Sequence, residues 1–180
     1  MIRAFVALEL DAALRSALAV QQFLLPLPAR VPVENLHLTL CFLGEVREQV
    51  LEEAHERLAD LRLRGFELEL AGLGLFGGDR PRLVYVGVVA NAALTGLQRK
   101  VERAARLAGI DLEARRFFPH VTLGRFRPPA IAEALRLERA VAEQGGFRAG
   151  AMAVREFVLF ESHLNRNGAR HEVLARYPLE

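Results

Sequence analysis

The chain has 180 residues, of which 52% are hydrophobic and 26% charged, and its formal net charge is +2. These values are typical of one globular domain or two small lobes, and they exclude a disordered chain or a protein covered by a polyanion-binding field. No apolar run is long enough to span a bilayer, the start MIRAFVALEL lacks a signal-peptide pattern, and the single Cys41 excludes an internal disulfide. We therefore expect a cytoplasmic protein with no membrane partner.

Hydrophobic periodicity predicts strands alternating with helices. Strands are predicted at 2–10, 36–43, 66–71, 83–90, 119–126, 147–154, 156–163 and 171–177. Helices are predicted at 12–25, 46–63, 92–108 and 131–144, the first with Asp11 as its N-cap. Prolines and glycines predict a loop over GLGLFGGDRPR, and the Asn165–Gly168 turn is predicted to join the last two strands. This pattern indicates an α+β or α/β fold in layers.

The stretch ENLHLTLCFLGE places an imidazole and a hydroxyl on one face of a predicted strand. Two sets of side chains alternate there, the apolar Leu36, Leu38, Leu40 and Phe42 and the mixed His37, Thr39 and Cys41. A single HxT usually lies on a half-solvated strand, with its polar side chains facing water. The same tetrad recurs as HVTL at residues 120–123, 83 residues after the first, and each tetrad precedes a predicted helix and strand. This repeat predicts two related lobes whose His/Thr pairs face each other across a cleft.

Two such pairs suit the chemistry of a phosphate group. In-line displacement at phosphorus requires one proton to be removed from the attacking oxygen and another to be delivered to the departing oxygen. Histidine can do both near neutral pH, and threonine hydroxyls can donate to the non-bridging oxygens. No metal or cofactor is needed for this chemistry, and the spacing alone does not assign the two proton-transfer roles.

The competing sites are weaker. A zinc site needs at least three ligands, and neither HExxH nor a cysteine pair is present. Cys41 lies four residues from His37, which is about 13 Å along a strand and too far for a nucleophile–base hydrogen bond, so we expect it to be a packing residue. GLGLFGGD lacks the Lys-Ser/Thr ending of a phosphate-binding loop. His55 is expected on the solvated surface of a charged helix. His163 and His171 have no repeated partner and are expected to be structural or exposed.

Arginines gather just before and after the second tetrad. Between Glu113 and Arg127 there are four arginines and one glutamate, an excess that indicates a local site for a few phosphates. Because Lys100 is the only lysine, arginine is also the ordinary basic surface residue of this chain, and the cluster fits either interpretation equally well.

The paired tetrads resemble the two HxTx motifs of the 2H phosphoesterase superfamily. FVALEL, VPVENLHLTLCFLGEV, RPRLVYVGV, RRFFPHVTLGR, FVLFESHL and the final YPL together resemble the bacterial and archaeal RNA 2′,3′-cyclic phosphodiesterases, a family long called 2′-5′ RNA ligase. The resemblance implies one domain over residues 1–180, built by internal duplication from two α+β lobes. Each lobe would be a small antiparallel-rich sheet with helices packed outside, with the active-site cleft between the lobes.

The resemblance also implies an activity, which is hydrolysis of a 2′,3′-cyclic phosphate at an RNA end to a 2′-phosphomonoester. His37 would be the proton donor and His120 the proton acceptor, while Thr39 and Thr122 would bind the phosphate. Reversal of the reaction with a 5′-hydroxyl would make a 2′-5′ linkage. The expected partner is the 3′ end of an RNA such as a tRNA fragment or oligonucleotide, and the protein is expected to be a monomer.

Further substrate contacts are expected from the same resemblance. Arg115 and Arg125 match the family's pattern around the second tetrad, although strand parity predicts that Arg125 points away from His120. Aromatic residues could stack on bases, and the candidates are Phe5, Phe42, Phe76, Tyr85 and Phe118. Tyr85 stands where the family often has tryptophan. A non-catalytic RNA-end binding module with the same fold remains the alternative, although such a module would have little need for two titratable groups.

Overall fold

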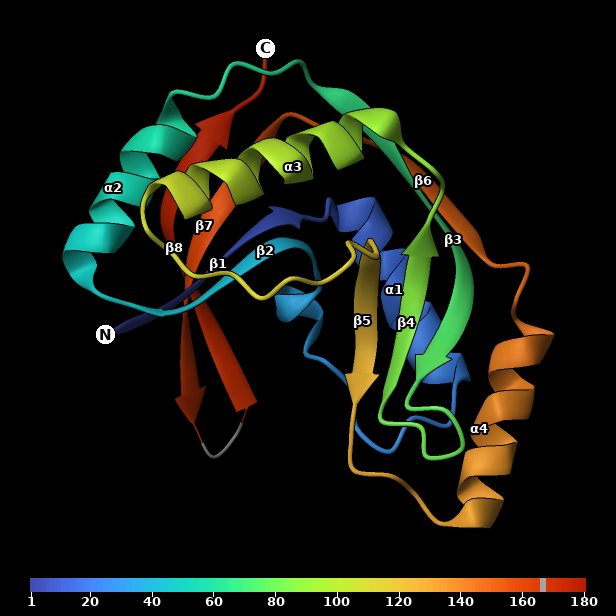
Figure 1. Ribbon diagram of the computed structural model, residues 1–180. Helices are drawn as coiled ribbons and strands as arrows, with labels where there is room; N and C mark the ends of the chain where they lie inside the picture. The colour runs from blue at the N-terminus through green and yellow to red at the C-terminus, as the bar shows by residue number, and fades with distance from the viewer. Residues whose placement is uncertain (166–167) are drawn as a thin grey trace.

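A single antiparallel sheet, whose strand order differs from the order along the chain, forms the centre of the molecule (Figure 1). The computed structural model describes residues 1–165 and 168–180, and its eight strands lie in the order β6-β3-β4-β5-β2-β1-β7-β8 with every neighbouring pair antiparallel. Their bounds are β1 Ile2–Glu9, β2 His37–Val46, β3 Phe66–Phe76, β4 Leu83–Val88, β5 His120–Arg125, β6 Arg148–Val154, β7 Glu156–Asn165 and β8 Gly168–Pro178. All eight predicted strands are present. The predicted turn between the last two includes residues 166–167, which lie outside the described residues.

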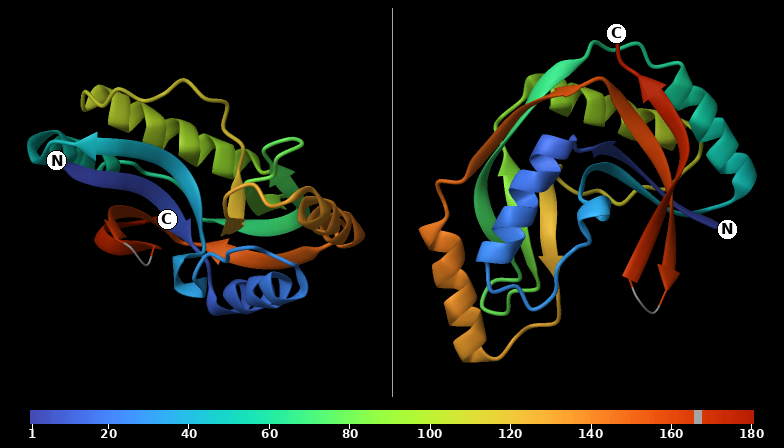
Figure 2. Two further views of the ribbon diagram at one scale, coloured as in Figure 1. Left: turned by 90° about the horizontal axis from the view of Figure 1, so that it is seen from below. Right: turned by 180° about the vertical axis from the view of Figure 1, so that it is seen from behind.

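Between the strands, the described residues form four α-helices and one short 3-10 helix. They are α1 Ala12–Leu24, η1 Val33–Asn35, α2 Glu48–Ala59, α3 Ala92–Leu107 and α4 Ile131–Glu143. The predicted cap is confirmed, because the Asp11 carboxylate accepts a 2.8 Å hydrogen bond from the Leu14 N–H. The view from behind shows α1 lying over the second half of the strands, where it contacts β5 and β6, while α3 packs on β2 and α2 on β8 (Figure 2). No helix among the described residues is long and apolar enough to cross a membrane.

The sheet consists of two four-stranded halves. The first half contains β2, β1, β7 and β8, and the second contains β5, β4, β3 and β6. Between them the β2–β5 ladder has one residue pair, Leu38 opposite Val121. The α+β class with antiparallel sheets and outer helices, expected from the resemblance, is therefore confirmed.

The internal repeat follows a different boundary from the predicted one. The first tetrad, its helix and the strand after it were expected to form one lobe, but β3 pairs with β4 and β6 in the second half. The units that correspond in the sheet are β1-α1-β2 and β4-α3-β5, each of which ends in a tetrad strand. Order along the chain does not show which strands pair, because pairing is decided by contacts distant in sequence.

β3 is also longer than predicted, since it continues through GLGLF to Phe76. This stretch was expected to be a loop because of its glycines. Gly74 has a packing role instead, because a Cβ there would lie 2.3 Å from the ring of Tyr85 on the neighbouring strand. The glycine therefore lets the Tyr85 ring lie directly over β3.

A β-bulge follows each tetrad's threonine. Ala7 lies opposite Thr39 and Val6 opposite Cys41, so Leu40 has no partner residue in β1. In the second half Leu123 is left out in the same way, between the pairs Tyr85–Thr122 and Val84–Gly124. The first six residues of β2 and of β5 then show the same order of burial. A bulge reverses which face the following residues occupy.

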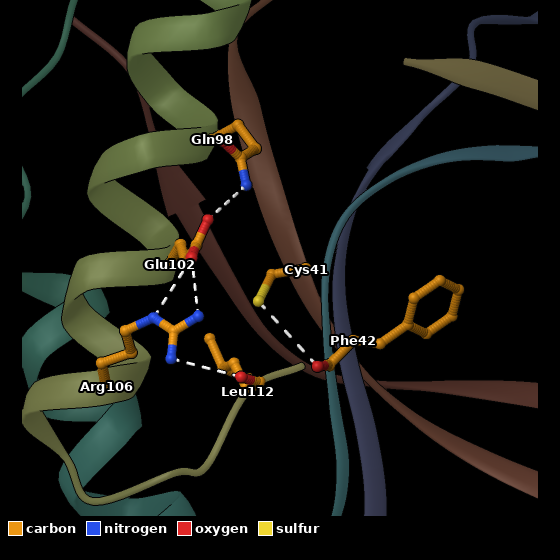
Figure 3. Close-up of polar contacts among 6 residues, drawn as sticks. All are labelled: Cys41, Phe42, Gln98, Glu102, Arg106 and Leu112. Atoms are coloured by element: carbon orange, nitrogen blue, oxygen red, sulfur yellow. Dashed lines mark hydrogen bonds and ion pairs between the residues drawn. The ribbon is translucent and has the colours of Figure 1, made fainter. Parts of the chain in front are cut away.

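Because of the bulge, Cys41 and Phe42 each lie on the opposite face of β2 from the one predicted. Strand alternation placed Cys41 with His37 and Phe42 with the buried leucines. In the structure Cys41 is 8% exposed in the core while Phe42 is 69% exposed and contacts Phe5 at a ring distance of 6.2 Å. Figure 3 shows Cys41 pointing toward α3 and Phe42 pointing to the other side of β2. The prediction that Cys41 is a packing residue is nevertheless confirmed.

We predict that replacing Gly124 by alanine destabilises the fold. The added Cβ would lie 2.5 Å from the carbonyl oxygen of Ala29, a backbone atom that cannot move aside without displacing the loop before β2. We expect a loss of about 1–3 kcal/mol in the free energy of unfolding, measured by urea denaturation.

Gly96→Ala is the matched control for this prediction. Gly96 lies inside α3, where a Cβ would meet nothing within 4 Å, so the gain in helix propensity should stabilise the protein by up to about 1 kcal/mol. A Gly124→Ala protein as stable as the wild type would contradict the proposed contact.

Candidate active site

Four side chains of the two tetrads project from one face of the sheet. Leu38 and Val121 lie opposite each other and both are fully buried, so they point to the same, core-facing side. Residues on either side of them in each strand must point to the other side. That side, which we call the site face, carries His37 and Thr39 from β2 and His120 and Thr122 from β5.

The register brings the two pairs together across the junction of the halves. Because β2 and β5 are antiparallel, His37 lies nearest Thr122, and Thr39 lies nearest His120. The two histidines are then diagonal neighbours, whose Cα atoms are typically about 7–8 Å apart. A phosphate group fits between two imidazoles at such a separation, with one threonine on each side.

Both histidines form the same hydrogen bond. His37 Nδ1 lies 2.6 Å from the carbonyl oxygen of Asn35, and His120 Nδ1 lies 2.7 Å from that of Phe118. A carbonyl oxygen only accepts hydrogen bonds, so each Nδ1 carries the hydrogen, and Nε2 is left as the atom that can take up or release a proton. This bond fixes the orientation and tautomer of both rings in the way that a proton-transfer group requires.

The surroundings of His37 are crowded and apolar. Its ring centre lies 5.0 Å from that of Phe5 and 5.3 Å from that of His171, and Phe5 stacks on Phe160. Burial lowers the pKa of His37 to about 4, against the opposing effect of its bond to the Asn35 carbonyl. Repulsion from His171 and His120 lowers the same pKa further. In the free protein His37 is therefore neutral at pH 7.

The surroundings of His120 are aromatic and open. The rings of Phe76, Tyr85 and Phe118 lie between 5.4 and 5.9 Å from the His120 ring, and Phe76 stacks on Tyr85 at 4.5 Å. Phe76 is 39% exposed and Phe118 49% exposed. A hollow of about 280 Å³ beside this group is lined by Tyr85, Gly87 and Phe118 together with β3 residues 71–73. The second half thus offers flat apolar rings to a ligand next to the imidazole.

The threonine hydroxyls are available for a ligand. Thr39 and Thr122 are both half-buried, and neither side chain hydrogen bonds to another residue in the described part of the chain. Donors without a protein partner beside two imidazoles can bind phosphate oxygens.

The structure separates the two candidate arginines. The bulge at Leu123 turns Arg125 to the site face, because Arg125 lies opposite Leu83, which shares a face with Tyr85. The parity argument that pointed Arg125 away from His120 was therefore wrong. Arg115 forms a 2.5 Å ion pair with Glu113, and its side chain is 81% exposed. In this arrangement Arg125 is placed to face a ligand, whereas Arg115 is engaged on the surface.

The structure places His171 of the edge strand β8 beside His37, a contact that sequence reasoning missed. His171 was expected to be structural or exposed, and its ring packs edge-on against that of His37 with an angle of 89° between the ring planes. It has no counterpart in the second half, so the repeat gave no signal for it. The histidines expected to lie outside the site do so, since His55 Nδ1 lies 2.8 Å from the hydroxyl of Tyr177 and His163 lies beside Glu161 and Glu172.

Cys41 belongs to a different environment. Burial raises the pKa of its thiol to about 12, and the nearby Glu102 raises it further, so the thiol stays protonated. Beside it Glu102 accepts hydrogen bonds from Gln98 and Arg106, and Arg106 also donates to the Leu112 carbonyl oxygen (Figure 3). These bonds hold α3 to the segment that leads toward β5. A nucleophilic Cys41 is excluded by its position and its pKa.

The described residues do not form a metal site. Within residues 1–165 and 168–180, no group of three or more His, Cys, Asp or Glu side chains is arranged to hold a metal ion. Glu9, the residue opposite His37 in β1, is ion-paired with Arg176, which also binds Glu156. The carboxylate nearest to His37 in register is therefore already engaged.

Known proteins resemble this chain in both sequence and fold. An RNA 2′,3′-cyclic phosphodiesterase of Aeropyrum pernix is 41% identical over 147 residues, covering 78% of this chain and 80% of that protein. One of Archaeoglobus fulgidus is 33% identical over 175 residues, covering 93% and 94%. The crystal structure of E. coli LigT complexed with 3′-AMP matches with a TM-score of 0.79 and 28% identity, covering 99% of this chain and 97% of LigT.

A family model described as the 2′-5′ RNA ligase superfamily matches residues 10–166. This match agrees with the resemblance drawn from the tetrads. The chain belongs to the 2′-5′ RNA ligase superfamily.

Proposed function

We propose that the protein hydrolyses the 2′,3′-cyclic phosphate at the 3′ end of an RNA to a 2′-phosphomonoester. The observation that carries this proposal is the pair of His/Thr sets on one face of the β2–β5 junction, each imidazole with Nδ1 bonded to a carbonyl and Nε2 free. Relatives from Aeropyrum pernix, Archaeoglobus fulgidus and Geobacillus stearothermophilus named RNA 2′,3′-cyclic phosphodiesterase support the activity.

In the proposed mechanism two histidines act on opposite sides of the phosphorus atom. His120 Nε2 takes a proton from water as its oxygen bonds to phosphorus, and His37 Nε2 gives a proton to the departing 3′ oxygen. The P–O3′ bond breaks, the 3′-hydroxyl is released, and the phosphate stays on the 2′ oxygen. Thr39 and Thr122 donate to the non-bridging oxygens, where negative charge builds up in the transition state.

The low proton affinity of His37 constrains this assignment. A donor must be protonated, yet burial holds the pKa of His37 near 4 in the free protein. We infer that the substrate supplies the missing interaction, because an anionic phosphate beside the imidazole favours its charged form and raises its pKa. His37 would then gain its proton as the substrate binds. The reverse assignment, with His37 as base and His120 as acid, would need no proton on His37 before the reaction begins.

Contacts beyond the phosphate are proposed on the side of His120. Arg125 faces the site and would add a charge-assisted bond to the phosphate or to a neighbouring one. Phe76, Tyr85 and Phe118 would stack on a base, because stacking tolerates any base. Phe5 and Phe42 would border the binding site on its other side, beside His37. Arg115 could contact the substrate only after its ion pair with Glu113 is broken.

Ligation is proposed as a minor reverse activity. If a 5′-hydroxyl takes the place of water, the same two proton transfers join it to the phosphate and form a 2′-5′ linkage. Water is the more abundant acceptor, so hydrolysis should dominate. The competing reading, a binding module without catalysis, predicts that the protein retains cyclic-phosphate ends without converting them.

We predict that His37→Ala and His120→Ala each lower the turnover number by about 10²–10⁴-fold, since each removes one proton transfer. The assay is conversion of a nucleoside 2′,3′-cyclic phosphate in the presence of EDTA, with the 2′- and 3′-monophosphate products separated by chromatography. The wild type should give the 2′-monophosphate at an undiminished rate with the chelator present.

His163→Ala is the control for these variants, because this exposed histidine faces Glu161 and Glu172 instead of the site. It should retain the wild-type rate. Wild-type protein that binds the cyclic nucleotide without turnover would favour the binding module. Turnover only with added metal would contradict the two-histidine mechanism.

We also predict that His37 makes the protein sensitive to acid. Its pKa in the folded state, about 4, lies below the ordinary value of 6.5, so the unfolded state binds this proton more readily. Stability is therefore unaffected above pH 6.5 and falls as the pH drops from 6.5 toward 4, by up to about 3 kcal/mol. Urea denaturation of the wild type and of His37→Gln at pH 7 and pH 4.5 measures this. Equal losses in both proteins would show that His37 is not the group responsible.

A further inference from the structure

The edge strand β8 contacts the surroundings of His37 at two places. The carbonyl oxygen of Ala169 accepts a 2.7 Å hydrogen bond from the side-chain amide of Asn35, and the His171 ring lies 5.3 Å from that of His37. Residues 169 and 171 are two apart on this strand; the first contacts Asn35 through its backbone carbonyl and the second contacts His37 through its ring. One strand thus reaches His37 both through Asn35 and directly.

The first contact acts on the hydrogen bond of His37. Asn35 accepts the His37 Nδ1–H at its own carbonyl oxygen, 2.6 Å away, while its backbone N–H donates to the Pro32 carbonyl oxygen at 2.8 Å. Its side chain is then fixed by Ala169. With the backbone and the side chain both bonded, the Asn35 carbonyl can take only a narrow range of directions, and that direction sets the plane and tautomer of the imidazole.

The second contact acts on the ring itself. The His171 ring meets His37 edge-on at 89° and also packs on Phe5 at 4.9 Å and Phe160 at 6.4 Å. His171 Nδ1 is buried with no hydrogen-bond partner among the described residues. The ring is therefore held by packing and not by hydrogen bonds from its Nδ1. Its contacts with His37 and Phe5 add to the crowding around the imidazole, whose burial lowers the pKa of His37.

His120 is held by a different arrangement. It makes the same bond to a carbonyl two residues earlier, that of Phe118, but its ring contacts are Phe76, Tyr85 and Phe118 from the second half. A carboxylate often orients a working histidine, but the one opposite His37, Glu9, is bonded to Arg176. The charged or titratable groups that act on His37 are His171 from β8 and His120 from β5.

We propose that β8 holds His37 in its working orientation through two positioning residues, Asn35, which is bonded to Ala169, and His171, which packs on the imidazole. The inference rests on the proposed role of His37 in proton transfer. It assigns a catalytic purpose to the far edge of the sheet, although neither residue has to touch the substrate.

Two readouts on the same variants test this inference. The first is kcat and KM with a nucleoside 2′,3′-cyclic phosphate, and the second is the pKa of His37, followed by the NMR signal of its ring Hε1. Asn35→Ala and His171→Ala should each lower kcat by about 10- to 100-fold with KM little changed. In His171→Ala the pKa of His37 should rise from about 4 toward its ordinary value, because burial of the ring and repulsion from His171 both decrease. In Asn35→Ala it should fall further, because the bond to the Asn35 carbonyl that favours the charged imidazole is loosened.

Two further variants serve as controls. His171→Phe keeps the packing ring and should restore kcat and the His37 pKa to near wild-type values. His163→Ala removes a histidine from the same pair of strands, where it faces Glu161 and Glu172, and should change neither readout.

The inference is overturned if Asn35→Ala and His171→Ala keep both the kcat and the His37 pKa of the wild type. A His171→Phe protein as impaired as His171→Ala would overturn the packing role. If no protein, wild type included, converts the cyclic phosphate, the proposed function fails. The pKa readout would then still decide whether β8 positions His37.

Discussion

The contact between Leu38 and Val121 is the point on which the site depends. It is the residue pair that joins β2 to β5, and both side chains are fully buried in the main core. Since side chains alternate along a strand, burial of these two forces both His/Thr pairs onto the other face. A slip of one residue would bury the imidazoles and expose the leucine or valine, at a cost of several kcal/mol in lost apolar burial. The core therefore fixes the register, and the register assembles the site.

The two halves use one local plan in different surroundings. Each tetrad contains a bulge at its last leucine, and each histidine bonds the carbonyl two residues earlier. We propose that this correspondence reflects an internal duplication within one domain over residues 1–180. The first half surrounds its histidine with buried rings, whereas the second leaves a hollow and exposed aromatic rings. Burial lowers the pKa of His37 in the first half. Unequal surroundings of this kind can divide the roles of general acid and general base between two similar groups.

Much of the site could be predicted because its signal is local and repeated. HLTL and HVTL carry the histidines, the threonines and the alternation that puts them on one face. Asp11 before an apolar helical pattern predicts the N-cap of the first helix. The structure confirms the strands, the cap and the α+β class, and it places Phe5 and Tyr85 against His37 and His120, respectively. The roles given to these residues stay proposals.

Other features depend on contacts that a linear pattern does not contain. β3 joins the second half because it pairs with β4 and β6, and no residue in the first tetrad unit signals that choice. The bulges reverse strand parity after Leu40 and Leu123, which misplaced Cys41, Phe42 and Arg125. Nothing in simple alternation reveals where a ladder skips a residue. His171 enters the site only because β8 folds back along β7 at the sheet edge.

The central claim is that His37 and His120 flank a single phosphate. The most direct measurement is an NMR titration of both ring Hε1 signals between pH 3 and 9, with and without saturating inorganic phosphate. The account predicts that phosphate raises the pKa of both histidines, and that of His37 from about 4, because the anion lies against both imidazoles. A phosphate that shifts only one of the two, or neither, would contradict a shared site.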